Sequence, residues 1–381
     1  MENLDMKRRD FMKFGMVAGG ALAAMTMLPK QLFAITSKAI TLDNCLQLTP
    51  RQMAEQSQLV QASWQELRSA AAGISDATIR NIVQAILDNP APTFMERYQS
   101  AAEKAALRKE LIAAGLLDEK AVPENADFPP SNGNPKQSPQ PFFSAPGSGY
   151  QSHHSYPGGV VTHTNLNVKV SVALFDGYAS TYGYSLNKDV VLASQILHDL
   201  HKPWVFQWLE DGSTRTELSL AGTGEHHVYG IAESMYRGLP TEVVVAQACA
   251  HNHAGSDADE KGVVGWLKAA AILAGKNPAQ EGYIAASGDT LPLPRSQEGF
   301  ICHLGDHDWV LSVPAAKWMI PILGNVAKNV YGMTDDDLKG KRFNQFRNYL
   351  FSQATIMNLY QVYRLEGEDS ITKIAKQLIA A

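Results

Sequence analysis

All eleven histidines of this 381-residue chain lie between His153 and His307. Imidazole is the commonest protein ligand for transition metals, and it gains or loses a proton near neutral pH. Because every histidine lies in one part of the chain, we expect this part to fold so that several imidazoles meet at one site. The clustering therefore predicts a metal site or a proton-transfer site between these two residues.

Composition excludes several other classes of protein. The chain is 45% hydrophobic and 19% charged, which is typical of a folded globular protein and not of a disordered, collagen-like or disulfide-dense one. Its three cysteines, Cys45, Cys249 and Cys302, are too few for a disulfide framework, although one pair remains open. The formal net charge of −5 makes nucleic acid an unlikely partner.

The first 34 residues have the features of an export signal. A basic segment that contains Arg8 and Arg9 precedes fifteen uncharged residues from Phe14 to Leu28, fewer than the roughly 20 that span a membrane. The two arginines followed by Asp-Phe-Met-Lys resemble the bacterial twin-arginine signal. The resemblance implies the twin-arginine export machinery as a partner, a periplasmic location and no stable membrane anchor after cleavage. The alternative is an uncleaved anchor or a chance basic cluster. Removing residues 1–34 takes away five basic and three acidic side chains, which changes the net charge to −7.

The remaining chain divides into three parts by composition. Residues 35–122 show helical spacing of apolar side chains and contain no histidine, which predicts a helical N-terminal region. Residues 123–149 hold seven of the nineteen prolines and are expected to form a linker. The alternative for this segment is an extended stretch that Phe142 and Phe143 dock onto the next domain.

Residues 150–381 return to helical patterns, so we expect a mainly α fold without repeats. The expected helices in this part lie at 168–182, 188–201, 225–237, 241–253, 262–274, 335–364 and 371–379. The sequence from Trp309 to Val313 is the one run with a weak strand pattern.

The strongest chemical signal is the adjacent pair His198-Asp199 at the end of an apolar helix. Neither side chain belongs among apolar neighbours without a partner, and a divalent metal binds both imidazole and carboxylate. Lys202 follows His198 by four residues and can share its helix face, where it could hold a phosphate oxygen.

The region from about 150 to 310 resembles the HD-domain superfamily of metal-dependent phosphohydrolases, an all-helical fold. His198-Asp199 matches the central doublet of that family, and Lys202 matches the lysine of its common extension. The segment His153-His154 followed by Gly158-Gly159 is similar to the lead-in of the family's exoribonuclease-like branch, which ends at a ligand histidine, here His163.

The resemblance implies four further positions for the site. His226 is favoured over His227 as the next metal ligand, and His251 is favoured over His253. The closing aspartate is displaced from its usual helix, and Asp306 is preferred to Asp308. The implied ligand set is therefore His163, His198, Asp199, His226, His251 and Asp306, with Asp199 able to bridge two ions.

The other histidines have simpler interpretations. We expect His201, His303 and His307 on the surface, and His153 and His154 on the surface or beside the ligands. Cys249 is expected in the core, and Trp204 and Trp208 are expected to pack rather than to stack on bases.

The leading hypothesis is an exported metal-dependent phosphohydrolase that acts on a phosphate ester or a nucleotide-like small molecule. One or two divalent ions (Mn, Fe, Zn, Mg or Ni) would activate water and neutralise charge. Lys202 would hold a phosphoryl oxygen, and His227 or His253 would relay a proton. Two alternatives share the scaffold: a di-iron oxygenase, and a metal-binding or ligand-binding protein without catalysis.

Overall fold

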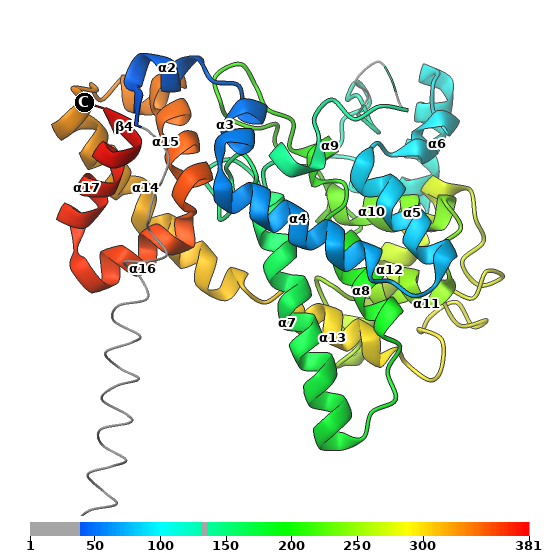
Figure 1. Ribbon diagram of the computed structural model, residues 1–381. Helices are drawn as coiled ribbons and strands as arrows, with labels where there is room; N and C mark the ends of the chain where they lie inside the picture. Colours follow the sequence, from blue (N-terminus) through cyan, green and yellow to red (C-terminus); the bar gives the residue numbers. More distant parts are fainter. Residues whose placement is uncertain (1–38, 131–133, 135, 381) are drawn as a thin grey trace, which may run out of the picture.

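The computed structural model describes residues 39–130, 134 and 136–380, so the predicted export signal lies outside the described residues. Within this part the chain is mainly helical, which confirms the predicted fold class (Figure 1). Its strands form two small pairs of two residues each.

Three groups of elements follow one another along the chain. The N-terminal group is β1 (Ile40–Thr41), α2 (Leu42–Gln47), α3 (Pro50–Gln56), α4 (Gln58–Ala72), α5 (Ala77–Asp88), η1 (Thr93–Arg97) and α6 (Ala101–Ala113), followed by η2 (Phe142–Ser144). The central group is α7 (Gly159–Tyr182), α8 (Lys188–Leu197), α9 (Lys202–Val205), β2 (Ser219–Leu220), β3 (Thr223–Gly224), α10 (Glu225–Tyr236), α11 (Thr241–Ala248), α12 (Asp257–Ala274) and α13 (Gln297–Gly305). The C-terminal group is α14 (Trp309–Tyr331), η3 (Asp337–Lys339), α15 (Lys341–Ala354), α16 (Ile356–Glu366), α17 (Glu368–Leu378) and β4 (Ile379–Ala380).

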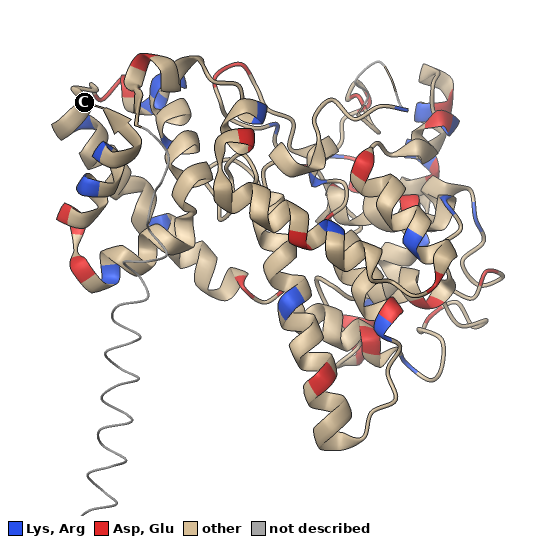
Figure 2. Cartoon of the chain, in the orientation of Figure 1, with Lys and Arg blue, Asp and Glu red and all other residues tan. Residues whose placement is uncertain are grey.

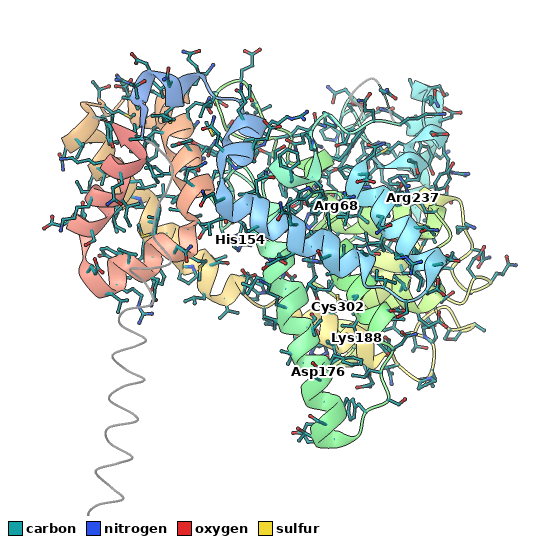
Figure 3. The ribbon with its side chains drawn as sticks, in the orientation of Figure 1. Arg68, His154, Asp176, Lys188, Arg237 and Cys302 are labelled. Atoms are coloured by element: carbon teal, nitrogen blue, oxygen red, sulfur yellow. The ribbon has the colours of Figure 1, made fainter. Side chains whose placement is uncertain are left out.

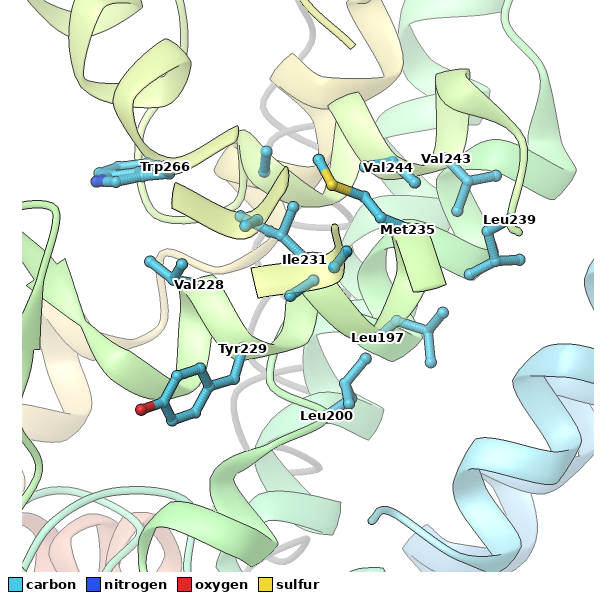
Figure 4. Close-up of a cluster of buried hydrophobic side chains, with 14 of the residues drawn as sticks. Leu197, Leu200, Val228, Tyr229, Ile231, Met235, Leu239, Val243, Val244 and Trp266 are labelled. Atoms are coloured by element: carbon cyan, nitrogen blue, oxygen red, sulfur yellow. The ribbon is translucent and has the colours of Figure 1, made fainter. Parts of the chain in front are cut away.

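The first of two hydrophobic cores surrounds α10 and α11. Val228, Ile231 and Met235 of α10 meet Val243 and Val244 of α11 (Figure 4). From Glu225 to Met235 every residue of α10 is buried, because α12 and α11 cover it. A helix enclosed in this way is apolar around most of its circumference and places its polar residues only where they have partners.

The second core belongs to the C-terminal group. Met319 and Leu323 of α14 pack with Phe346 and Leu350 of α15. The chain's first described helices join it, since α15 contacts α2, α3 and α4. Strand β1 pairs in parallel with β4, which brings Ile40 opposite Ile379.

The predicted N-terminal region is shared between these two cores. Cys45 and Met53 lie in the second core, whereas Leu67 lies in the first, so α4 runs from one to the other (Figure 1). In the proline-rich segment, Phe142 is buried in the first core and stacks on Trp64 with 6.0 Å between ring centroids. At η2 this segment therefore packs against α3, α4 and α7.

Two expectations about local structure are wrong. The run from Trp309 to Val313 is the beginning of α14, not a strand, and the helix expected at 335–364 is divided into η3, α15 and α16. The sequence also predicted no helix where α13 lies. Pro314 and Pro321 lie inside α14, where proline ordinarily ends a helix, so the sequence hides this helix.

The three cysteines are buried and unpaired, which settles the open question of a disulfide. The stretch Gln297–Tyr331 is long and apolar enough by composition to cross a membrane, and half of its most apolar window is buried inside the protein. Charges of both signs are interspersed over the described chain, without a continuous basic stripe (Figure 2).

Candidate metal centre

The six predicted ligands converge at one place from five parts of the fold. His163 lies in the first two turns of α7, His198 caps the end of α8 and Asp199 follows it. The others are His226 at the start of α10, His251 in the loop after α11, and Asp306 at the end of α13. The histidine clustering along the chain is therefore a clustering in space.

Three of these residues form what we call the inner half of the centre. His163 Nε2 lies 3.1 Å from Asp306 Oδ1, and His198 Nε2 lies 3.3 Å from the same oxygen. The two imidazole Nε2 atoms face each other at 3.3 Å. All three ligand atoms lie close enough together to hold one ion.

Asp199 connects the inner half to an outer half made of His226 and His251. Its Oδ2 is 3.1 Å from both His163 Nε2 and His198 Nε2. Its Oδ1 is 3.3 Å from His226 Nε2 and 3.7 Å from His251 Nε2. One carboxylate therefore presents one oxygen to each half, so Asp199 could contact an ion in either half.

Three of the four histidines are held from behind through Nδ1. His163 Nδ1 lies 3.0 Å from Asp308, and His198 Nδ1 lies 2.7 Å from the carbonyl oxygen of Gln195. His226 Nδ1 contacts the carboxylate of Glu217. A partner on Nδ1 fixes the tautomer that leaves the Nε2 lone pair directed at a metal.

Gly158 and Gly159, which precede His163, stand at positions where a larger side chain would clash or be strained. A Cβ on Gly159 would overlap the carbonyl oxygen of His154, and Gly158 has φ of 91°, a conformation that favours glycine. The chain can therefore fold back tightly before α7, which places His154 beside Asp308 at 2.8 Å. Figure 3 shows His154 near the junction of the central and C-terminal groups.

The two candidate closing aspartates have different surroundings. Asp306 caps α13 and belongs to the inner half, where Asn167 donates to it at 2.9 Å. Asp308 begins α14 and lies behind His163, between that residue and His154. Asp306 Oδ1 faces both His163 and His198, whereas Asp308 contacts His163 through Nδ1 and, with His154, forms another group that could hold an ion.

The donor set fits divalent metal ions. Asp199 Oδ1 and His226 Nε2 are buried and make no hydrogen bond within the described residues, whereas Asp199 Oδ2 is paired with the ammonium of Lys202. Buried polar atoms without such bonds are costly, and a cation would satisfy them together. Nitrogen and carboxylate ligands suit zinc, manganese, iron and nickel.

In the metal-free protein, the closeness of carboxylates and imidazoles shifts the pKa values of the candidate ligands. Burial lowers the pKa of His198, but Asp199 and Asp306 outweigh it and raise that pKa to about 9. Burial also opposes the raised pKa of His226, which Glu217 and Asp199 bring to about 9. The pKa of His251 is lowered, mainly by burial. Protons therefore occupy part of the space that metal ions would take.

A cavity of about 380 Å³ opens onto the centre. Its wall includes Lys202, whose Nζ lies 2.5 Å from Asp199 Oδ2. Phe206 and Trp309 supply apolar surface. A small molecule bound here would meet a lysine ammonium, the candidate metal ligands and an aromatic rim.

The two predicted proton relays lie away from this cavity. His227 is buried beneath His251, with 4.1 Å between ring centroids, and contacts the carbonyl oxygen of Ala248. His253 lines a second cavity with Phe300. The roles predicted for these two histidines stay untested.

Two histidines expected on the surface are not there. His201 is fully buried and packs against Phe94, and burial together with Arg237 holds its pKa well below the usual value. His303 is half-buried, donates a hydrogen bond from Nδ1 to the Ala250 carbonyl oxygen at 2.9 Å, and lines the cavity. Sequence spacing could not distinguish a lining histidine from a solvated one.

No separate signal in the sequence pointed to Glu217 or Asn167. Glu217 precedes His226 by nine residues and reaches it through the β2–β3 hairpin. Asn167 is one helical turn after His163, so helical spacing could have placed it beside that ligand.

The chain has a distant homologue that is a phosphodiesterase. A dihydroneopterin 2',3'-cyclic phosphate phosphodiesterase from Methanocaldococcus jannaschii is 32% identical to it over 99 residues. These residues are 26% of this chain and 39% of the relative, so the chain spans about two fifths of that protein's length. No protein-family model and no solved structure matches the chain.

Proposed function

We propose that this protein is a metal-dependent phosphodiesterase of the HD type that acts on a small molecule. The observation that carries the proposal is the convergence of four histidines on Asp199, whose two oxygens face different histidine groups. The similarity to a phosphodiesterase supports a phosphoester as the bond that is broken.

The chain's own residues supply binding and charge. Lys202 is almost fully buried at the floor of the cavity, where its ammonium would pair with a non-bridging phosphoryl oxygen. His163, His198, Asp199 and Asp306 would hold one ion, and Asp199, His226 and His251 a second. Such ions, when bound, lower the pKa of a coordinated water and stabilise charge on phosphoryl oxygens.

The size and surroundings of the cavity favour a small substrate. A volume of about 380 Å³ falls at the low end of the range for small-molecule sites. Phe206 and Trp309 offer aromatic surface for the organic part of the ester. Because the relative's name specifies a cyclic phosphate, 2',3'-cyclic phosphates are the first substrates to test.

The test is turnover by the purified protein after loading with Mn²⁺, Fe²⁺ or Zn²⁺. We expect hydrolysis of bis(p-nitrophenyl) phosphate and of 2',3'-cyclic nucleotides, and loss of both with H198A. D176N alters an exposed carboxylate on α7 and serves as the control (Figure 3). Oxygen consumption by the iron form without hydrolysis of any phosphoester would overturn the proposal in favour of the oxygenase.

We also propose export to the periplasm through the twin-arginine pathway, which rests on Arg8, Arg9 and the apolar stretch after them. A reporter fused to residues 1–40 should reach the periplasm, and R8K/R9K should retain it in the cytoplasm. Export that is unchanged by this double substitution would contradict the proposal.

A further inference from the structure

We infer that Glu217 is the positioning residue of the outer half of the metal centre and that it sets the affinity of that half for its ion. The inference rests on the metal centre of the proposed function and deepens it. Glu217 would act through His226, without itself being one of the six ligands.

Glu217 holds His226 at two points. Its Oε1 contacts Nδ1 of the imidazole and accepts a hydrogen bond from the backbone N–H of His226 at 3.2 Å. On the opposite side of the ring, Nε2 lies 3.3 Å from Asp199 Oδ1. The carboxylate therefore fixes both the position of the residue and the tautomer that offers Nε2 to a metal.

The β2–β3 hairpin returns the chain so that Glu217, just before β2, lies next to the start of α10. Its two ends are joined because Glu225 N–H donates to the Leu218 carbonyl at 3.0 Å and Leu218 N–H donates to Glu225 Oε1 at 3.2 Å. The carboxylate of Glu217 is thus brought over the first turn of α10, which carries His226.

Gly224 leaves the space that the carboxylate occupies. A Cβ at this position would overlap Oε1, Oε2 and Cδ of Glu217. The backbone at Gly224 has φ of −67°, which any residue can adopt. Gly224 therefore makes room for Glu217 where it lies, and a side chain at this position would make the end of Glu217 move.

The other ligands do not share this support. His163 relies on Asp308 and His198 on the Gln195 carbonyl, so both supports belong to the inner half. His251 stacks on His227, and its ion pairs within the described part of the chain are all made through Nε2. Glu217 is therefore the carboxylate that serves the outer half.

Removing such a support from a metal-ligating histidine typically weakens metal binding by about 10- to 100-fold. We expect E217A to weaken one of two Mn²⁺ binding events by about 100-fold and to leave the other unchanged. E217Q keeps an acceptor for Nδ1–H but loses the charge, so its loss should be smaller, about tenfold. G224A should weaken the same event by less than E217A does, because the new methyl group makes the flexible end of Glu217 move but leaves its carboxylate in place.

The experiment is calorimetric titration of the metal-free full chain with Mn²⁺, together with metal content by elemental analysis. E210A removes an exposed carboxylate from the same loop and is the matched control. Equal binding by wild type and E217A, equal weakening of both events, or a single event in the wild type would overturn the inference. If E217A does not fold, E217Q and G224A decide by the same criterion.

This readout does not depend on catalysis. Selective loss of one ion in E217A from a protein that hydrolyses no phosphoester would refute the proposed function and still support the role of Glu217. Hydrolysis of phosphoesters together with unchanged metal binding in E217A would support the proposed function and refute the role of Glu217.

Discussion

The inner and outer halves of the metal centre are built on different kinds of structure. His163, His198 and Asp306 are placed by α7, α8 and α13, and all three are buried. His226 begins α10 after a hairpin, whereas His251 lies in a loop with 21% of its side chain exposed. Helices hold ligands more rigidly than loops do, so the inner half should retain its ion and the outer half should exchange it more readily.

The largest expected effect tests the residue that the halves share. D199N removes the charge that faces both, and metal stabilisation worth several kcal/mol corresponds to a fall in turnover of at least about 10³-fold. Elemental analysis should show loss of ions from both halves. D176N should match the wild type, and retention of one full equivalent by D199N would show that Asp199 does not connect the halves.

The next effect is the pH dependence of metal binding, which should differ between the two halves. In the metal-free protein the pKa of His198 is about 9 and that of His163 is raised well above its ordinary value, chiefly because Asp308 and Asp199 outweigh burial. In the outer half only His226 is raised, to about 9, while the pKa of His251 is lowered. Protons therefore compete with metal at two inner histidines and at one outer histidine.

Below pH 9, each unit of acidification should weaken the inner event by up to about 100-fold and the outer event by about tenfold. The raised pKa values also stabilise the metal-free fold below about 6.5, the pKa in unfolded chains, and this stabilisation is lost as pH rises through about 9. The Tm of the metal-free protein should accordingly fall over this range while that of the loaded protein rises. Parallel pH slopes for both events would contradict the assignment.

A smaller effect concerns the residue that would touch substrate. K202M removes an ammonium beside Asp199 Oδ2 but no metal ligand, so kcat should fall by roughly 30-fold, as for a charged hydrogen bond of about 2 kcal/mol. Metal content should remain at the wild-type level. A large loss of ions in K202M would mean that Lys202 stabilises the bridging carboxylate instead of the substrate.

The smallest effect is expected beneath the outer half. H227F keeps a planar ring under His251 but loses the contact with the Ala248 carbonyl, so turnover should stay within about fivefold of the wild type. A general acid or base contributes about 10²-fold or more. A loss of that size, with metal content unchanged, would support the alternative role of His227 as a proton relay.

The sequence predicted the residues that converge on Asp199 better than the residues that hold them in place. His198 and Asp199 are neighbours in the sequence and were singled out by their chemistry. His163, and the preference for His226 and His251 within their pairs, came from resemblance to a family. Asp306 could be preferred to Asp308 only weakly, because both lie in the short joint between two helices that the pattern did not reveal. Two internal prolines concealed α14, and with it the second core.

What could not be predicted depends on long-range contacts. Glu217 reaches His226 through a hairpin of two-residue strands, which are too short to leave an alternating pattern. His201 gives no local sign of burial, because its burial depends on Phe94, over one hundred residues earlier. Such contacts are set by packing between elements and not by periodicity within one element.

The joint between α13 and α14 lies at the metal centre and is the point about which α14 would pivot. Asp306 ends a helix of the first core, and Asp308 begins a helix of 23 residues that is anchored in the second. At 1.5 Å per residue α14 is a lever about 35 Å long. If its far end swung by about 1 Å, a point some 3 Å from the pivot would move by only about 0.1 Å. A small displacement at the far end of α14 would therefore leave Asp308, which contacts His163 at the base of this helix, almost unmoved.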